Sequence, residues 1–186
     1  MNNLVSYNLF EMSKISDKDI LHRIIDFYEY LIEHIEIDLT NIAKKLGTEF
    51  KDIRCGYFIE IDNVRSIYGS SNLEKFRNDL LNANGFDDVD DLEININFKF
   101  PFPYNNSKKN SFFNFAQQRY GESKKISFYE DFILYQIDSA SSSDVIKYKY
   151  NYKDLDNGRF YKEVLSNIEK WIIEKIEQKV IYTTNE

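Results

Sequence analysis

The sequence predicts an α+β fold, in which a mostly antiparallel sheet of about four strands carries the N- and C-terminal helices packed on one face. Residues 92–100 alternate apolar and polar side chains, the pattern of a strand with one buried and one wet face. Near both ends of the chain, apolar residues instead recur every three or four positions, as in a helix. At 186 residues, with 6 glycines and 2 prolines, the chain is expected to form one globular domain over residues 1–186.

The first part of the chain predicts two helices. Ser16 followed by acidic residues is a typical N-cap, so we expect a helix over residues 17–36. Asp38 is expected to cap a shorter helix over residues 39–46, which ends at Gly47.

The middle of the chain predicts a strand, a helix and a second strand. Residues 57–61 are rich in β-forming side chains, and Asn72 begins a helix that runs through Leu81. The strand at 92–100 follows and is expected to end at the prolines that begin with Pro101.

The last third of the chain predicts two strands and a long helix. The strands are expected over residues 126–137 and 144–152, joined by a serine-rich connection at 139–143. The helix is expected over about residues 159–180, and its apolar stripe places Trp171 in the core.

Composition restricts the classes of protein. The single cysteine, Cys55, excludes an intramolecular disulfide and fits a reducing compartment. The first residues lack the pattern of a secretion signal, and no apolar run reaches the length of a membrane span, so we expect a cytoplasmic protein. The abundance of Ile, Asn, Lys, Tyr and Phe, whose codons are AT-rich, favours a bacterial or phage source.

Two acidic groups are the candidate partner-binding residues. They are Glu29, Glu33 and Glu36 on the first helix, and Asp87, Asp88, Asp90 and Asp91 before the strand at 92–100. A solvated helix face and a solvated turn would look the same. We favour the second group slightly, because four aspartates within five residues exceed what a turn needs. Its spacing does not match a calcium loop, so we expect no metal site.

One segment of this acidic chain is basic and rich in aromatic residues. The net charge is −7, but residues 99–125 hold six basic residues against one glutamate, so this segment is +5 and the remainder is −12. Its candidate nucleic-acid contacts are Lys108, Lys109, Arg119, Lys124 and Lys125. Positive charge interleaved with aromatic rings is typical of single-strand binding, although the same aromatics could simply fill the core. The acidic remainder disfavours nucleic acid as a partner.

Two further patterns carry less weight. Residues 39–54 resemble the first helix and turn of a helix-turn-helix, but the would-be reading helix at 49–54 has no net charge, which disfavours DNA reading. His22, His34 and Cys55 could suggest a Cys/His hydrolase. The histidines are twelve residues apart on one helix and cannot share a metal there, and Cys55 is better explained as a core residue.

These observations favour a non-enzymatic acidic protein that inhibits a basic or nucleic-acid-handling protein by stoichiometric occlusion. An immunity protein against a toxin and a phage inhibitor of a defence complex are both of this type. The alternative is a nucleic-acid or nucleotide-binding module that uses residues 99–125, or an enzyme built on that module. The sequence contains no Gly-rich phosphate loop, H-E-x-x-H or G-x-S-x-G motif, and we expect no cofactor.

Overall fold

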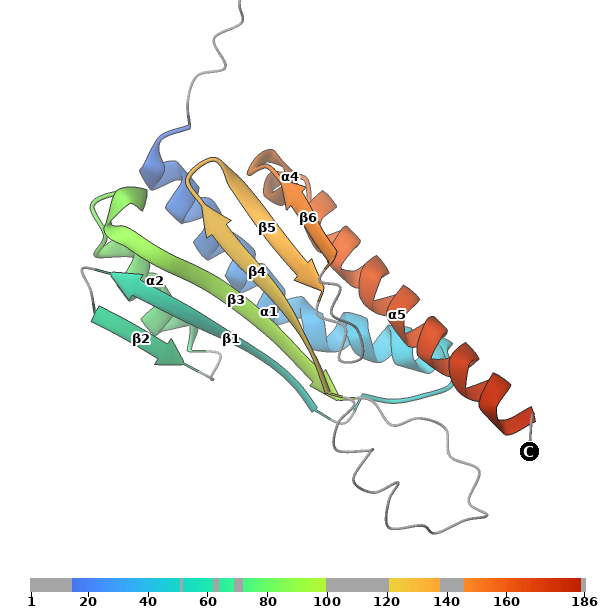
Figure 1. The fold of residues 1–186 in the computed structure, drawn as a ribbon. Coiled ribbons are helices and arrows are strands. Elements are labelled where there is room, and N and C mark those ends of the chain that lie inside the picture. The colour runs from blue at the N-terminus through green and yellow to red at the C-terminus, as the bar shows by residue number, and fades with distance from the viewer. Residues whose placement is uncertain are drawn as a thin grey trace, which may run out of the picture.

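A computed structural model of the chain describes residues 15–50, 52–61, 64–68, 72–99, 121–137 and 146–184. Helices and strands fill most of these ranges (Figure 1). The helical elements are α1 (Asp17–Lys45), α2 (Leu73–Leu81), the short 3₁₀ turn η1 (Phe86–Asp88), α4 (Lys153–Asp156) and α5 (Arg159–Thr184). The strands are β1 (Asp52–Ile61), β2 (Val64–Tyr68), β3 (Val89–Lys99), β4 (Gly121–Tyr129), β5 (Phe132–Ile137) and β6 (Ile146–Tyr150).

The strands form one sheet in the order β2-β1-β3-β4-β5-β6, and each neighbouring pair is antiparallel. The predicted α+β class and antiparallel sheet are therefore confirmed. The predicted number of strands was wrong, because the described residues contain six strands and not about four. The expected strand at 126–137 is a hairpin that turns at Glu130 and Asp131, where a single aspartate, without glycine, asparagine or proline, is a weak turn signal. The strand β2 was missed because it is short and lacks clear alternation.

The first helix is continuous, so the predicted break near residue 37 was wrong. Ser16 is the N-cap, and its side chain accepts a hydrogen bond from the backbone N–H of Asp19. Asp38 does not cap a second helix. It lies inside α1, where its carboxylate accepts a hydrogen bond from the hydroxyl of Tyr161.

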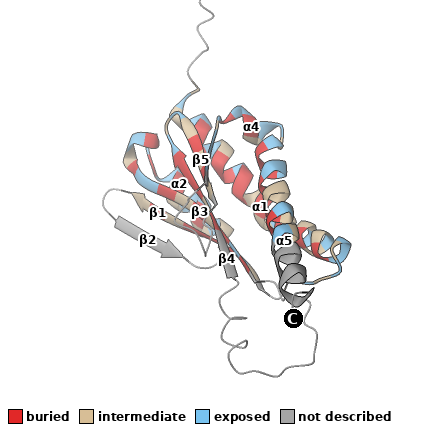
Figure 2. Cartoon of the chain, turned by 45° about the vertical axis from the view of Figure 1, so that its right-hand side comes forward, coloured by how far each residue is buried: buried red, intermediate tan, exposed pale blue. Residues whose placement is uncertain are grey.

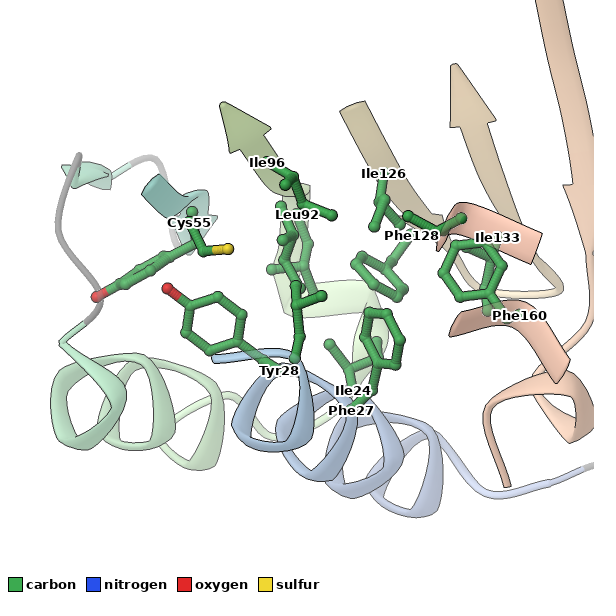
Figure 3. Close-up of a cluster of buried hydrophobic side chains, with 14 of the residues drawn as sticks. Ile24, Phe27, Tyr28, Cys55, Leu92, Ile96, Ile126, Phe128, Ile133 and Phe160 are labelled. Atoms are coloured by element: carbon green, nitrogen blue, oxygen red, sulfur yellow. The ribbon is translucent and has the colours of Figure 1, made fainter. Parts of the chain in front are cut away.

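The core lies on one face of the sheet. On β3, alternate residues are buried as the sequence predicted: Leu92, Ile94, Ile96 and Phe98. In Figure 3, Phe27 and Tyr28 project from α1 toward strand residues of this cluster. The ring of Phe27 lies 6.4 Å from that of Phe128 on β4.

The terminal helix α5 contributes ring contacts with the strands. The rings of Phe160 and Tyr135 on β5 lie 6.0 Å apart, edge to face. Trp171 is buried as predicted, with its ring 5.7 Å from that of Phe98 on β3. Along α1 and α5, buried residues alternate with exposed ones, as amphipathic helices require (Figure 2).

The helix-turn-helix pattern of the sequence does not form that motif in the structure. Ile53 and Arg54, which would belong to its reading helix, lie in β1.

Within the described part of the chain, no helix combines the length and apolarity that crossing a membrane requires.

Candidate interaction surface

The outer face of α1 exposes two large apolar side chains. Tyr30 is 44% exposed, and Ile37 is 61% exposed. They are seven residues apart, about two turns of helix, and therefore lie on the same side. The core does not require either residue there, because the buried stripe of α1 is complete without them. Of the described large hydrophobic residues, Ile37 has the highest exposed fraction.

Neighbouring rings hold the side chain of Tyr30 in place. The imidazole of His34 stacks on its ring, with 4.0 Å between centroids and 15° between planes. Tyr161 on α5 contacts the same ring edge to face at 5.1 Å. A ring that is both exposed and fixed loses little conformational entropy when a partner binds, which is the property of an interface anchor.

Exposed carboxylates lie beside these apolar residues on α1. Helical spacing places Asp26, Glu33 and Ile37 on the side of α1 that carries Tyr30, and both carboxylates are exposed. Glu36 is also exposed, about 100° around the helix axis from Ile37, and we include it as a flanking charge. We define the α1 outer face as Asp26, Tyr30, Glu33, Glu36 and Ile37.

Glu29 differs from the other carboxylates of α1. Its Oε2 lies 2.6 Å from a guanidinium nitrogen of Arg77 on α2, and both side chains are partly exposed. Its charge is thus already used to join two helices. Of the three glutamates predicted to bind a partner, Glu33 and Glu36 lie on the α1 outer face, and Glu29 lies beside it.

In the second predicted group, Asp87 and Asp88 lie in η1, whereas Asp90 and Asp91 lie in the first residues of β3. One of the four has a local structural contact. The Oδ2 atom of Asp88 accepts two hydrogen bonds of 2.9 Å, from the backbone N–H and the side-chain amide of Asn84. This contact closes the turn between α2 and β3. Asp87, Asp90 and Asp91 are exposed. The three exposed aspartates are charged surface without a large exposed apolar residue among them.

The structure describes two of the five candidate nucleic-acid contacts. Lys124 is fully buried on the helix-facing side of β4, with its Nζ 5.6 Å from the centre of the Trp171 ring. Lys125 forms an ion pair with Glu93 on the other side of the sheet. Lys108, Lys109 and Arg119 lie outside the described residues.

Cys55 is a buried core residue on β1. Burial raises the pKa of its thiol to about 12, so the sulfur is a neutral thiol at physiological pH and a poor nucleophile. His22 is exposed and His34 is half-buried, and each Nδ1 contacts a backbone carbonyl of α1. In the described ranges, no three His, Cys, Asp or Glu side chains are grouped to hold a metal ion.

Neither Tyr30 nor Ile37 was predicted from the sequence as a binding residue. Both are apolar residues on the otherwise polar side of an amphipathic helix, and this irregularity was the available signal of a binding surface. It is a weak signal, because single exposed apolar residues are common on protein surfaces.

No protein-family model, curated protein or solved structure matches the chain. The function proposed below is therefore based on the α1 outer face and its residues.

Proposed function

We propose that the protein is a non-enzymatic binding protein that occludes a basic or nucleic-acid-handling protein partner through the α1 outer face. The observation that supports this best is the pairing of two exposed apolar side chains, Tyr30 and Ile37, with the exposed carboxylates beside them. Apolar anchors inside a charged rim are the usual anatomy of a protein interface.

The charges and the anchors have separate roles in this proposal. The carboxylates of Asp26, Glu33 and Glu36 attract a positively charged partner and raise the association rate. Tyr30 and Ile37 then lose contact with water, which slows dissociation. We also propose that both terminal helices pack on one face of the sheet. This packing would leave the opposite side of α1 open to a partner.

The biological role we propose is inhibition inside a bacterial cell. Carboxylates on a helix can substitute for the phosphates that a toxin or a defence complex binds. An immunity protein and a phage anti-defence inhibitor would both act in the cytoplasm and in a one-to-one complex with the target.

The alternative is a nucleic-acid or nucleotide-binding module that uses residues 99–125, or an enzyme of that kind. Neither of the two described basic side chains favours it. Lys124 is buried, and the charge of Lys125 is paired with that of Glu93.

The test is capture of a partner from a lysate of the source organism, followed by titration of the purified partner's activity. We expect inhibition to saturate at one molecule of this protein per partner. The variant Tyr30→Ala/Ile37→Ala should bind at least about fivefold more weakly, because an interface anchor contributes more than about 1 kcal/mol.

The matched control is Asp87→Ala/Asp90→Ala, which changes two exposed residues of the other acidic group and leaves Asp88 in place. Equal binding by the wild type and both variants would reject the α1 outer face. Turnover of a substrate, or capture that disappears after nuclease treatment, would reject the occlusion mechanism and favour the alternative.

A further inference from the structure

The strand β6 is the last strand of the sheet, and it pairs with β5 on one side (Figure 1). Among the described strands, none pairs with its other side. An edge strand presents backbone N–H and C=O groups that can pair with another extended chain. The residues along this edge therefore determine which chain could add to it.

One row of core residues, aligned across the strands, ends at this edge with a partly exposed side chain. The strand register aligns Tyr57, Ile94, Ile126, Tyr135 and Tyr148 across five neighbouring strands. The first four are at most 2% exposed, whereas Tyr148 is 38% exposed. Its ring is stacked with that of Tyr135, with 6.3 Å between centroids. An apolar side chain on an added strand would lie beside Tyr148 and extend the row.

The opposite side of β6 carries two exposed lysines. Lys147 and Lys149 flank Tyr148, and alternation along a strand places both on the other face of the sheet. The Nζ of Lys149 lies 3.9 Å from the centre of the Phe132 ring on β5. This contact keeps its positive charge on that face of the sheet, over the neighbouring strand β5.

We propose that the free edge of β6 binds an extended acidic segment of another protein as an added antiparallel strand. An apolar residue of that segment would lie opposite Tyr148, and carboxylates on either side of it would lie opposite Lys147 and Lys149. Opposite charges directly across two strands stabilise their pairing, and the backbone hydrogen bonds supply the rest of the affinity. The ligand is thus a segment that alternates acidic and apolar residues.

The same lysines disfavour a second copy of this chain. Antiparallel pairing of two β6 strands about Tyr148 would place Lys147 of each copy opposite Lys149 of the other. Like charges directly opposite destabilise a strand pair. Lysine on an edge strand is a common protection against self-pairing, and here it leaves the edge open to an acidic chain.

This inference is independent of the proposed function. It uses the edge of the sheet and a partner of the opposite charge, whereas the proposed function uses the α1 outer face and a basic partner. Either can fail without the other.

The test is an NMR titration of the full-length protein with the acetylated peptide Ser-Glu-Val-Glu-Val-Glu-Ser. We expect the backbone amides of residues 146–150 to shift and to exchange hydrogen more slowly in the complex. A peptide with the same composition but without alternation, and one with lysine in place of each glutamate, should bind at least about tenfold more weakly. These peptide comparisons need only the wild-type protein.

The variant Lys147→Glu/Lys149→Glu should lose about tenfold in affinity for the acidic peptide and should bind the lysine peptide instead. The variant Lys162→Glu/Lys170→Glu makes the same change in net charge at exposed positions of α5 and should bind the acidic peptide like the wild type.

Several results would overturn the proposal. They are the absence of shifts in β6 at millimolar peptide, equal binding of the scrambled peptide, and an unchanged preference in the β6 variant. Dimers of the free protein that dissociate when β6 is mutated would show that a second copy occupies the edge. Shifts at β6 caused by a single-stranded oligonucleotide, and not by the peptide, would identify nucleic acid as the ligand.

Discussion

The hydroxyl of Tyr161 donates a 2.7 Å hydrogen bond to the carboxylate of Asp38, and this contact joins α5 to the middle of α1. Burial, and then the hydrogen bond to Asp38, raise the pKa of Tyr161 above its usual range. In the sequence, Asp38 has the features of a helix N-cap. The structure instead gives its carboxylate a partner 123 residues away, and α1 continues through the position.

The variant Tyr161→Phe should lower the free energy of unfolding by about 1 to 2 kcal/mol, because a hydrogen bond to a charged acceptor is lost. Denaturant unfolding of this variant, of Asp38→Ala, which removes the acceptor, and of the double variant forms a double-mutant cycle. We expect a coupling energy of at least about 0.5 kcal/mol. Additive effects of the two changes would mean that the contact does not stabilise the fold.

The aspartates around the start of β3 should differ in their effect on stability. Asp88→Ala removes the acceptor of both hydrogen bonds from Asn84 and should cost about 1 kcal/mol, the usual cost of losing such a local cap. Asp87→Ala and Asp90→Ala change exposed side chains and should stay within about 0.5 kcal/mol of the wild type. Thermal unfolding measures all three, and a similar loss at Asp87 would contradict the assignment.

Trp171 should be one of the most sensitive core positions. Trp171→Ala removes a large buried ring that contacts Phe98, and it should cost about 3–5 kcal/mol in urea unfolding. Its exposed neighbour supplies the control, because Lys170→Ala should change little. A truncation at Lys153 that remained soluble and equally stable would show that α5 is dispensable for the core.

Stability should fall at alkaline pH in part because of Cys55. Burial raises the pKa of this thiol to about 12 in the folded protein, whereas an unfolded thiol titrates near 8.5. The unfolded state therefore releases its proton first, and the stabilisation present below about pH 8.5 is lost as the pH rises toward 12.

Between pH 8 and pH 10, the wild type should lose about 1 to 2 kcal/mol more than the variant Cys55→Ala. Denaturant unfolding at both pH values measures this difference. The tyrosines also begin to titrate in this range, but they are the same in both proteins, so their contribution cancels in the comparison. Parallel curves for the two proteins would show that the buried thiol does not resist ionisation.

The two acidic groups should differ in their effect on partner binding. Glu33→Lys/Glu36→Lys should slow association with the captured partner by about tenfold or more, because steering by complementary charge is lost. Raising the salt concentration should slow the wild type and have a weaker effect on this variant. Stopped-flow or surface-based rates at low and high salt measure both effects.

The matched variant for this experiment is Asp87→Lys/Asp90→Lys, which keeps Asp88. We expect it to associate almost like the wild type. If this variant were slowed and the α1 variant were not, the acidic group around the start of β3 would be the binding surface, as the sequence alone slightly favoured.

The sequence by itself determined the features that depend on neighbouring residues. Ser16 caps α1, the alternation at residues 92–100 fixes which side chains of β3 are buried, and the stripe of α5 places Trp171 in the core. Local hydrogen bonds and the periods of helix and strand act within a few residues, so they can be read from the chain.

The burial of Lys124 was open to prediction from the sequence but was not predicted. It shares the strand parity of Ile126 and Phe128, so the period of β4 already predicts that it faces the core. Because residues 99–125 carry a net positive charge, Lys124 was instead predicted as a candidate nucleic-acid contact.

Only the tertiary structure decided which charged and apolar residues remain available at the surface. It assigned Asp38 to Tyr161 and Glu29 to Arg77, and it left Tyr30 and Ile37 exposed on α1. Each of these outcomes depends on which distant segment lies beside the residue, because a carboxylate or an aromatic ring has the same local preferences with or without a partner. The sheet edge at β6 has the same origin, since a strand becomes an edge only through the order in which all the strands pair.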